Sequence, residues 1–321
     1  MSPYRSYNQY LKELFGCRVY KVSIDAGFSC PNRDGRKGYN GCTFCDAHGA
    51  SSLTNKNTKN IQEQVLDNIE SRRERYGAKK FIAYFQSYTN TYAPIEELKK
   101  MYDDSISCDP DIVGLSISTR PDCVNEEIIK LISSYKDKLP YVSIEYGMQT
   151  MHDKTLATLN RGETHLDFIK AVEVTKKYNI DQCAHVILGL PGESWNDQME
   201  TAKTIARLGV NGVKIHILVA MEGTPIADDY KKGLWQPLEY QEQVTLACDF
   251  MEQLRPDCII HRIGGNGHAD NIVAPKWIIK NRVQILRDVV KEFAIRNSYQ
   301  GKRYISNQEI SSLSNNNHTH T

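Results

Sequence analysis

Three cysteines with the spacing of a metal-cluster motif lie near the N-terminus, in the segment GFSCPNRDGRKGYNGCTFCDAHG. Cys30 is followed by eleven residues and then Cys42, and Cys45 comes after two more residues. Thiolates at this spacing can converge on one face of an iron-sulfur cubane, and the glycines between them allow the turns that the loop needs. Three protein ligands leave one iron open, where a small molecule with an amine and a carboxylate can chelate.

Other uses of these thiols are also compatible with the spacing alone. They suit a zinc site with a nearby fourth ligand such as His48, and they also suit buried free cysteines. Nine cysteines without a secretion signal argue against a disulfide framework, because the cytosol keeps thiols reduced. The remaining six cysteines show no paired ligand spacing, so we expect no second cluster.

The cysteine loop, with CPNRDG beginning at Cys30, resembles that of radical S-adenosylmethionine (SAM) enzymes of the YhcC/YtqA (MnmL) type. These are relatives of the radical SAM domain in the Elongator catalytic subunit. The resemblance runs from about Tyr7 to Asn297, and the long gap between the first two cysteines is typical of this branch. It implies a [4Fe-4S] cluster held by Cys30, Cys42 and Cys45, with SAM on the open iron. An electron from the cluster then cleaves SAM to a 5′-deoxyadenosyl radical.

Seven short apolar runs that alternate with helical patterns predict the elements that position this loop. The runs are Val19–Ala26, Phe81–Gln86, Ile112–Ser118, Tyr141–Tyr146, Ala184–Gly189, Val213–Val219 and Cys258–Arg262. Ile61–Tyr76 and Gln241–Leu254 are two of the predicted helices. Buried strands separated by helices predict a parallel sheet. We expect an α/β fold, a partial (β/α)6 TIM-like radical SAM barrel with an N-terminal cluster loop and a C-terminal helical extension.

Chemistry in such folds sits at the carboxyl ends of the strands, and the resemblance places SAM there. YFQSYTNTY is expected to meet the amino acid end of SAM, Glu145 its ribose hydroxyls, Arg161 its carboxylate, and HVILGLPGES its adenine. Plain strand–turn junctions and a helix-capping arginine are the structural alternatives. The expected SAM-binding residues are Gln86, Thr89, Asn90, Ser118, Arg120, Glu145, Gln149, Arg161, Ile187 and Leu190.

Four polar residues interrupt the late apolar runs. Lys214, His216, His261 and Arg262 either satisfy hydrogen bonds in the core or project into the mouth of the barrel. Single histidines are usually structural. Because these four residues recur on two late strands, we expect them to face the substrate as catalytic residues.

The length of 321 residues is compatible with one large domain, and no apolar run is long enough to cross a bilayer. The opening residues lack a signal-peptide core, which predicts a cytoplasmic protein. We expect the barrel over residues 1–270, a basic helical extension over 271–305 with one helix from about Lys276 to Asn297, and a disordered tail over 306–321.

Overall charge does not identify a partner, because 40 basic and 39 acidic residues give a net charge of +1. Locally, residues Lys276 to Arg303 carry eight basic and two acidic side chains, and Arg72 to Lys80 form another basic run. Such runs are often solvated faces, but they also suit a phosphate backbone.

The resemblance favours tRNA as the substrate. MnmL-type members are implicated in converting carboxymethylaminomethyl-uridine to aminomethyl-uridine at the wobble position, and a flipped-out base would enter the barrel. The expected partners are tRNA, an electron donor such as flavodoxin or ferredoxin, and a downstream methyltransferase, with no membrane. The alternatives are a radical SAM enzyme acting on a small molecule or protein, and a non-catalytic metal-containing tRNA-binding protein.

Overall fold

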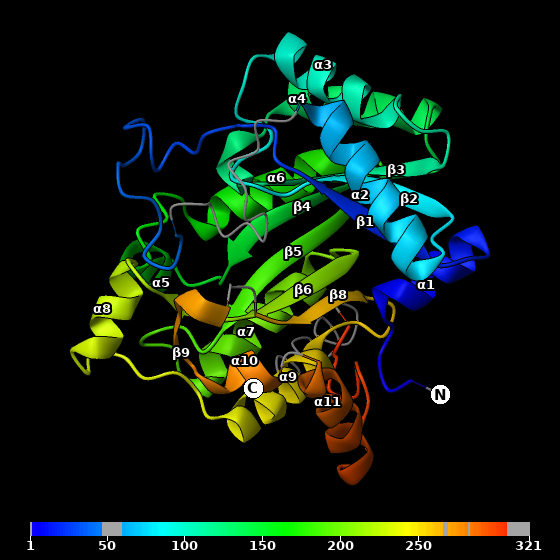
Figure 1. Ribbon diagram of the computed structural model, residues 1–321. Coiled ribbons are helices and arrows are strands. Elements are labelled where there is room, and N and C mark those ends of the chain that lie inside the picture. The colour runs from blue at the N-terminus through cyan, green and yellow to red at the C-terminus, as the bar shows by residue number, and fades with distance from the viewer. Residues whose placement is uncertain (1, 47–59, 266–268, 282, 307–321) are drawn as a thin grey trace, which may run out of the picture.

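A curled sheet of seven parallel strands forms the centre of the molecule (Figure 1). The computed structural model describes residues 2–46, 60–265, 269–281 and 283–306. The spatial order is β1-β2-β3-β4-β5-β6-β8, so each strand joins the sheet beside its predecessor. All seven predicted runs are strands: β1 Val19–Ile24, β2 Lys80–Phe85, β3 Ile112–Thr119, β4 Tyr141–Gln149, β5 Asp181–Leu188, β6 Gly212–Ile217 and β8 Ile259–Gly264. The predicted partial barrel is confirmed, with one strand more than the six units expected.

Helices connect the strands and cover the outer face of the sheet (Figure 1). The predicted helix Ile61–Tyr76 is present with these bounds; a capping box of Asn60 and Glu63 starts it, and Gly77 at φ 59° ends it. The full set is α1 Tyr7–Phe15, α2 Ile61–Tyr76, α3 Ile95–Ile106, α4 Glu126–Ser134, α5 Asp153–Thr158, α6 His165–Lys176, α7 Trp195–Arg207, α8 Pro225–Lys231, α9 Tyr240–Gln253, α10 Trp277–Asn281 and α11 Gln284–Ile295. Among the described residues, none of these helices is long and apolar enough to cross a membrane.

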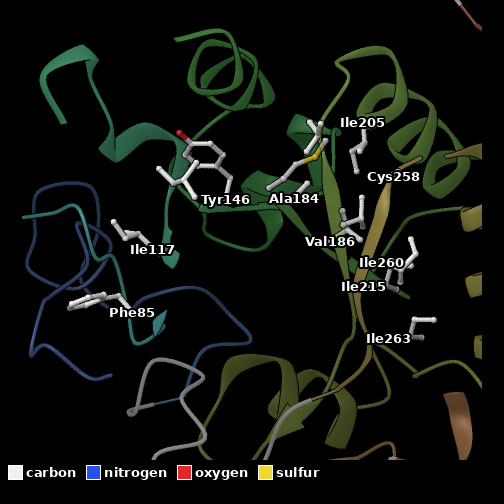
Figure 2. Close-up of a cluster of buried hydrophobic side chains, with 14 of the residues drawn as sticks. Phe85, Ile117, Tyr146, Ala184, Val186, Ile205, Ile215, Cys258, Ile260 and Ile263 are labelled. Atoms are coloured by element: carbon white, nitrogen blue, oxygen red, sulfur yellow. The ribbon is translucent and has the colours of Figure 1, made fainter. Parts of the chain in front are cut away.

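Side-chain alternation along the strands separates an apolar outer face from a polar inner face. Figure 2 shows the buried apolar side, with Phe85, Ile117, Tyr146, Ala184, Val186 and Ile215 among the residues that pack beneath the helices. The neighbouring positions Tyr84, Ser116, Glu145, His185 and Lys214 therefore point to the opposite, inner face. The strand register places these inner residues beside one another, with Tyr84 opposite Ser116 and His185 opposite Lys214.

Helix α1 closes the lower end of the half-barrel between its two edge strands, β1 and β8. Arg5 O accepts a hydrogen bond from Ile260 N at 2.8 Å, so the chain just before α1 pairs with β8. Leu11 packs with Val19 of β1 and with Tyr141, which begins β4. The inner face is thus covered from below and stays accessible from the carboxyl ends of the strands.

The C-terminal part differs from the single helix predicted over Lys276–Asn297. It forms two helices, α10 and α11, and a short strand β9 (Ile272–Ala274) that pairs with β7 (Ala220–Met221). The apolar side of α11 packs into the main core through Ile285, Val289 and Phe293. Several of its charges are paired, since Arg296 contacts Asp249 at 2.6 Å. Residues 307–321 of the predicted disordered tail lie outside the described residues.

Candidate active site

A cavity opens at the carboxyl ends of the strands, and the three motif cysteines lie on its wall. Of the nine cysteines, only Cys30, Cys42 and Cys45 line it. Nine further residues predicted from sequence line the same cavity: Gln86, Thr89, Ser118, Arg120, Gln149, Arg161, Ile187, Lys214 and His216. The fold therefore brings twelve of the seventeen predicted site residues to one place.

The cysteine loop is held against the sheet by a buried asparagine. Asn32 is only 1% exposed, and its Nδ2 donates to the carbonyl oxygens of Asn160 at 2.5 Å and Arg161 at 2.9 Å. Asn160 in turn donates through its own Nδ2 to Gly41 O at 2.7 Å. These bonds fix both ends of the loop relative to the segment that follows α5.

Positively charged donors point at the motif sulfurs. Arg33 Nη2 lies 3.3 Å from Cys45 Sγ, and Arg161 Nη1 lies 3.4 Å from Cys42 Sγ. Asn32 Nδ2 adds a weaker contact to Cys42 Sγ at 3.7 Å. Guanidinium donors stabilise thiolates rather than neutral thiols, so this donor set fits an anionic iron-sulfur cluster on the three cysteines.

A buried ion network braces the wall behind the cysteines. Arg120 pairs with Asp122 at 2.8 Å and with Glu163 at 3.1 Å, and Glu163 also pairs with Arg161. Lys37, from the cysteine loop, pairs with Asp122. Burial alone would raise the pKa of Asp122, but the hydrogen bond and charge of Arg120 lower it overall. The network links the loop to the ends of β3 and β4.

A second polar group lies deeper on the inner face, and we call Tyr84, His185, Lys214 and His216 the polar floor because all four line the cavity. Beneath them the fully buried Glu145 carboxylate accepts from Tyr84 OH at 3.0 Å, His185 Nε2 at 2.6 Å and Lys214 Nζ at 3.0 Å. Its other oxygen pairs with Lys21.

The charges beneath the floor set its protonation states. Burial alone would raise the pKa of Glu145, but the ammonium groups of Lys21 and Lys214 hold that pKa well below its usual value. Burial, followed by the charge of Lys214, lowers the pKa of His185 to about 4. Burial and the neighbouring His185 likewise hold the pKa of His216 well below its usual value. At neutral pH the floor therefore combines neutral imidazoles with charged ammonium groups.

Comparisons with known proteins agree with this arrangement. The Radical SAM superfamily profile matches residues 34–205, and the Radical_SAM C-terminal domain profile matches residues 210–294. The protein YtqA of Bacillus subtilis (strain 168) is 38% identical over 310 residues, which cover 97% of this chain and 95% of YtqA. Protein YhcC of Escherichia coli (strain K12) is 35% identical over 269 residues, covering 83% of this chain and 85% of YhcC.

This chain belongs to the radical SAM superfamily. The fold is also similar to a solved structure: Elp3 from Methanocaldococcus infernus superposes with a TM-score of 0.66 at 19% identity. That match covers 88% of this chain and 64% of the Elp3 chain, so this chain spans less than two thirds of Elp3. The cofactors of this radical SAM chain are a [4Fe-4S] cluster and SAM.

Two of the expected SAM contacts, Glu145 and Arg161, are engaged by other groups of the protein in this radical SAM site. Glu145 was expected to bind the ribose, but its carboxylate is fully buried below the cavity and is already engaged by five side chains. Arg161 was expected to pair with the SAM carboxylate. Its guanidinium lies at the cavity wall, but it donates to Glu163, to Gly147 O at 2.8 Å and to Cys42 Sγ.

Four other predicted residues do not line the cavity. Asn90 is buried behind the wall, where its Nδ2 donates to Ser118 O at 2.8 Å, so it shapes the strand end. Leu190 packs in a side cluster with Leu218 and Trp235. His261 lies low in the half-barrel, where its ring stacks on Tyr7 at 4.0 Å, and Arg262 Nη2 donates to Gly265 O at 3.0 Å. The structure thus gives His261 and Arg262 structural contacts rather than a place in the cavity.

Several lining residues were not among the predicted site residues, and Arg33, Tyr84 and His185 are three of them. Tyr84 and His185 carried a usable signal, because both fall at inner positions of strands that were predicted correctly. Two non-glycine residues on the cavity wall, Tyr88 and Gln149, also adopt left-handed backbones, with φ of 58° and 64°. Such conformations cluster at functional sites, but they are visible only in the structure.

Proposed function

We propose that this radical SAM enzyme converts carboxymethylaminomethyl-uridine to aminomethyl-uridine at the wobble position of tRNA. The observation that carries the proposal is the cavity itself, which joins three thiols at its mouth to a polar, positively charged floor. A substrate that enters from the open end and reaches this floor would occupy the cavity that the three cysteines also line. One cavity can therefore hold the cluster and also bind the polar side chain of a modified base.

Under this proposal Cys30, Cys42 and Cys45 hold the cluster, and SAM occupies the adjoining wall. Gln86, Thr89, Ser118, Arg120, Gln149 and Ile187 line that wall and are the proposed SAM contacts. Bound together, the cluster and SAM would supply a 5′-deoxyadenosyl radical able to take a hydrogen atom from the methylene beside the substrate nitrogen. Loss of one more electron to an external one-electron acceptor would give an imine, and its hydrolysis by water would release the two-carbon unit as glyoxylate and leave the free amine. The chain holds that methylene in place, while Lys214 and His216 face the substrate.

Resemblances to enzymes that act on tRNA support the substrate class. A protein of Methanocaldococcus jannaschii named tRNA uridine(34) acetyltransferase is 28% identical over 181 residues, which cover 55% of this chain and 28% of that protein. We propose tRNA as the partner in the cytoplasm, together with an electron donor such as flavodoxin or ferredoxin. A downstream methyltransferase is the proposed next enzyme, because the aminomethyl product carries a free amine.

Mass analysis of wobble nucleosides tests the assignment. Transfer RNA from a strain lacking the gene should accumulate carboxymethylaminomethyl-uridine, and anaerobically reconstituted enzyme with SAM and reductant should convert it to aminomethyl-uridine. A Cys42→Ala variant is the matched control and should leave the nucleoside unconverted. Unchanged wobble nucleosides in the deletion strain would rule out the tRNA assignment while leaving membership of the superfamily intact.

A small molecule or a protein is the second candidate substrate class. The observation that favours it is the pairing of basic groups in the C-terminal extension, because Arg296 and Arg303 contact Asp249 and Glu252 and are less available to phosphates. Binding of tRNA as a function of salt separates the two classes. A steep loss of affinity between 50 and 200 mM salt supports tRNA, as roughly six or more phosphate contacts would give. Absence of tRNA binding at low salt supports the second class.

A further inference from the structure

The base of the cavity holds more ammonium groups than carboxylates. Lys21 and Lys214 both pair with the single carboxylate of Glu145, at the base of the cavity. His185 and His216 are neutral, because their pKa values lie below the usual value. Within this group of ion pairs, two ammonium groups and one carboxylate leave one excess positive charge beside the cavity. An isolated buried charge is costly, so an anion entering from the cavity would be stabilised there.

Lys214 has a donor available for such an anion. Its ammonium group has three N–H bonds, of which one is directed at Tyr84 OH at 2.7 Å and one at Glu145 Oε2 at 3.0 Å. The third is not used by these two contacts, and Lys214 lines the cavity although it is only 8% exposed. The tyrosine and the carboxylate hold the ammonium group in place, so little side-chain entropy is lost when a ligand binds.

His216 supplies a second donor on the same strand. It lies two residues after Lys214, so both side chains point to the inner face, and both line the cavity. Within the described part of the chain its closest ring partner is His185, with centroids 5.2 Å apart. A neutral imidazole offers one N–H donor, and an adjacent anion would favour protonation of the ring.

We propose that Lys214 and His216 form a subsite that binds a carboxylate of the substrate. The inference rests on the proposed function and deepens it, since the carboxymethyl unit removed in that reaction ends in a carboxylate. One excess positive charge and two donors match a monoanion with two oxygens better than a phosphate dianion. The aminomethyl product lacks this anion, so the same subsite favours substrate over product and promotes product release.

The subsite is tested by binding without turnover. SAM-loaded, unreduced holoenzyme is titrated with anticodon stem-loops that carry carboxymethylaminomethyl-uridine, its neutral carboxamide analogue or aminomethyl-uridine. Wild-type enzyme should bind the carboxylate at least about tenfold more tightly than the carboxamide, a difference of roughly 1.4 kcal/mol. Lys214→Gln should reduce this preference to near unity. Lys214→Arg should retain it, and the exposed Lys12→Gln should have no effect.

For Glu145→Gln we expect the preference for the carboxylate ligand to change in the opposite direction from that in Lys214→Gln. Removing the carboxylate beneath the floor increases the local positive charge, so the preference for the carboxylate ligand should rise. A purely structural role for Lys214, as the partner of Glu145, predicts instead that Lys214→Gln and Glu145→Gln weaken all three ligands alike. Iron content and circular dichroism of each variant establish that it is folded and loaded.

The outcomes separate this inference from the proposed function. Equal wild-type affinities for carboxylate and carboxamide, with wobble conversion intact, would overturn the subsite and leave the function standing. If no stem-loop binds, N-methylglycine and N-methylglycinamide serve as probes in ligand-observed NMR. Binding of N-methylglycine alone, lost in Lys214→Gln, would then support the subsite while the tRNA assignment fails. Binding of neither probe would overturn both.

Discussion

Individual side chains around the cysteine loop act on the electronic properties of the metal site. Arg33 and Arg161 each direct a guanidinium at a motif sulfur, 3.3 Å from Cys45 Sγ and 3.4 Å from Cys42 Sγ. Hydrogen bonds and positive charge at the sulfurs stabilise the reduced, more negative cluster and raise its reduction potential. The two arginines therefore favour uptake of the electron on which cleavage of SAM depends.

Arg33→Met should lower the midpoint potential of the cluster. Loss of one charged hydrogen bond, worth about 1.5 to 3 kcal/mol, corresponds to a shift of up to roughly 65 to 130 mV for a one-electron couple. Potentiometric titration followed by electron paramagnetic resonance measures the shift. Arg36→Met is the matched control, because Arg36 lies on the same loop but is exposed and stacks on Tyr92 at 5.6 Å. An equal potential in the Arg33 variant and the wild type would show that the guanidinium does not tune the cluster.

Some residues of the site could be predicted from the sequence, and others could not. The spacing of Cys30, Cys42 and Cys45 indicated a shared site, and the structure places all three on one cavity. Glu145 was expected to bind the ribose of SAM, and its burial beneath the cavity depends on side chains that come from several strands. His185 was treated only as part of the strand segment HVILGLPGES, because its partners Glu145 and Lys214 come from other strands. A short stretch of sequence does not reveal which residues of other strands a side chain will contact.

Among the elements, the cysteine loop is attached to the barrel in part through one buried asparagine. Asn32 is buried and bonds the two carbonyl groups of Asn160 and Arg161. Without its amide, the carbonyl of Asn160 loses this donor and the buried carbonyl of Arg161 keeps only Arg120 Nη2, at 2.7 Å, so the expected cost is about 1 to 3 kcal/mol. The loop would then leave its position more often, and the cluster would be more accessible to chelators.

Asn32→Ala should therefore reduce iron retention. Reconstituted variant protein should contain less iron per chain, and a chelator should remove the cluster several-fold faster than from the wild type. Asn40→Ala, at an exposed position of the same loop, is the matched control and should behave like wild type. Iron assays and loss of visible absorbance after addition of chelator measure both effects. Identical kinetics for all three proteins would contradict the anchoring role of Asn32.

The elements themselves were largely predictable, because their signals are local. The seven apolar runs all became strands, and helix Ile61–Tyr76 has the capping residues Asn60 and Gly77 that its sequence indicates. The prediction over Lys276–Asn297 was wrong in its continuity, since α10 ends at Asn281 and α11 begins at Gln284. Helical spacing in the apolar pattern did not reveal this interruption. In the structure α11 packs against α9 and the main core.

At the scale of the whole molecule, folding buries several histidines in neutral form. Burial lowers the pKa of His185 and of His261 to about 4 and holds that of His216 well below its usual value. The unfolded chain takes up protons on these rings as the pH falls below about 6.5, while the folded protein does not. Stability is therefore unaffected by these groups above pH 6.5 and declines as the pH falls from 6.5 towards 4.

Urea unfolding under anaerobic conditions checks this pH dependence. Each buried ring should remove up to about 1.4 kcal/mol of unfolding free energy per pH unit between pH 6.5 and 5.5. His261→Gln should flatten the slope, since this ring lies away from the cavity and burial is the largest cause of its lowered pKa. Glu145 keeps its charge throughout this range, because its pKa lies well below the usual value. A stability that is flat from pH 6.5 to 5.5 would contradict the neutral state of the buried rings.

The account as a whole depends on three sulfur ligands that leave one iron free for SAM, and one measurement addresses this directly. Anaerobically reconstituted protein, reduced in the presence of SAM, should form 5′-deoxyadenosine and methionine in equal amounts. SAM should also change the electron paramagnetic resonance spectrum of the reduced cluster, and Cys42→Ala should lose both effects. A colourless zinc centre, or a reduced cluster whose spectrum is unchanged by SAM and yields no 5′-deoxyadenosine, would contradict the account.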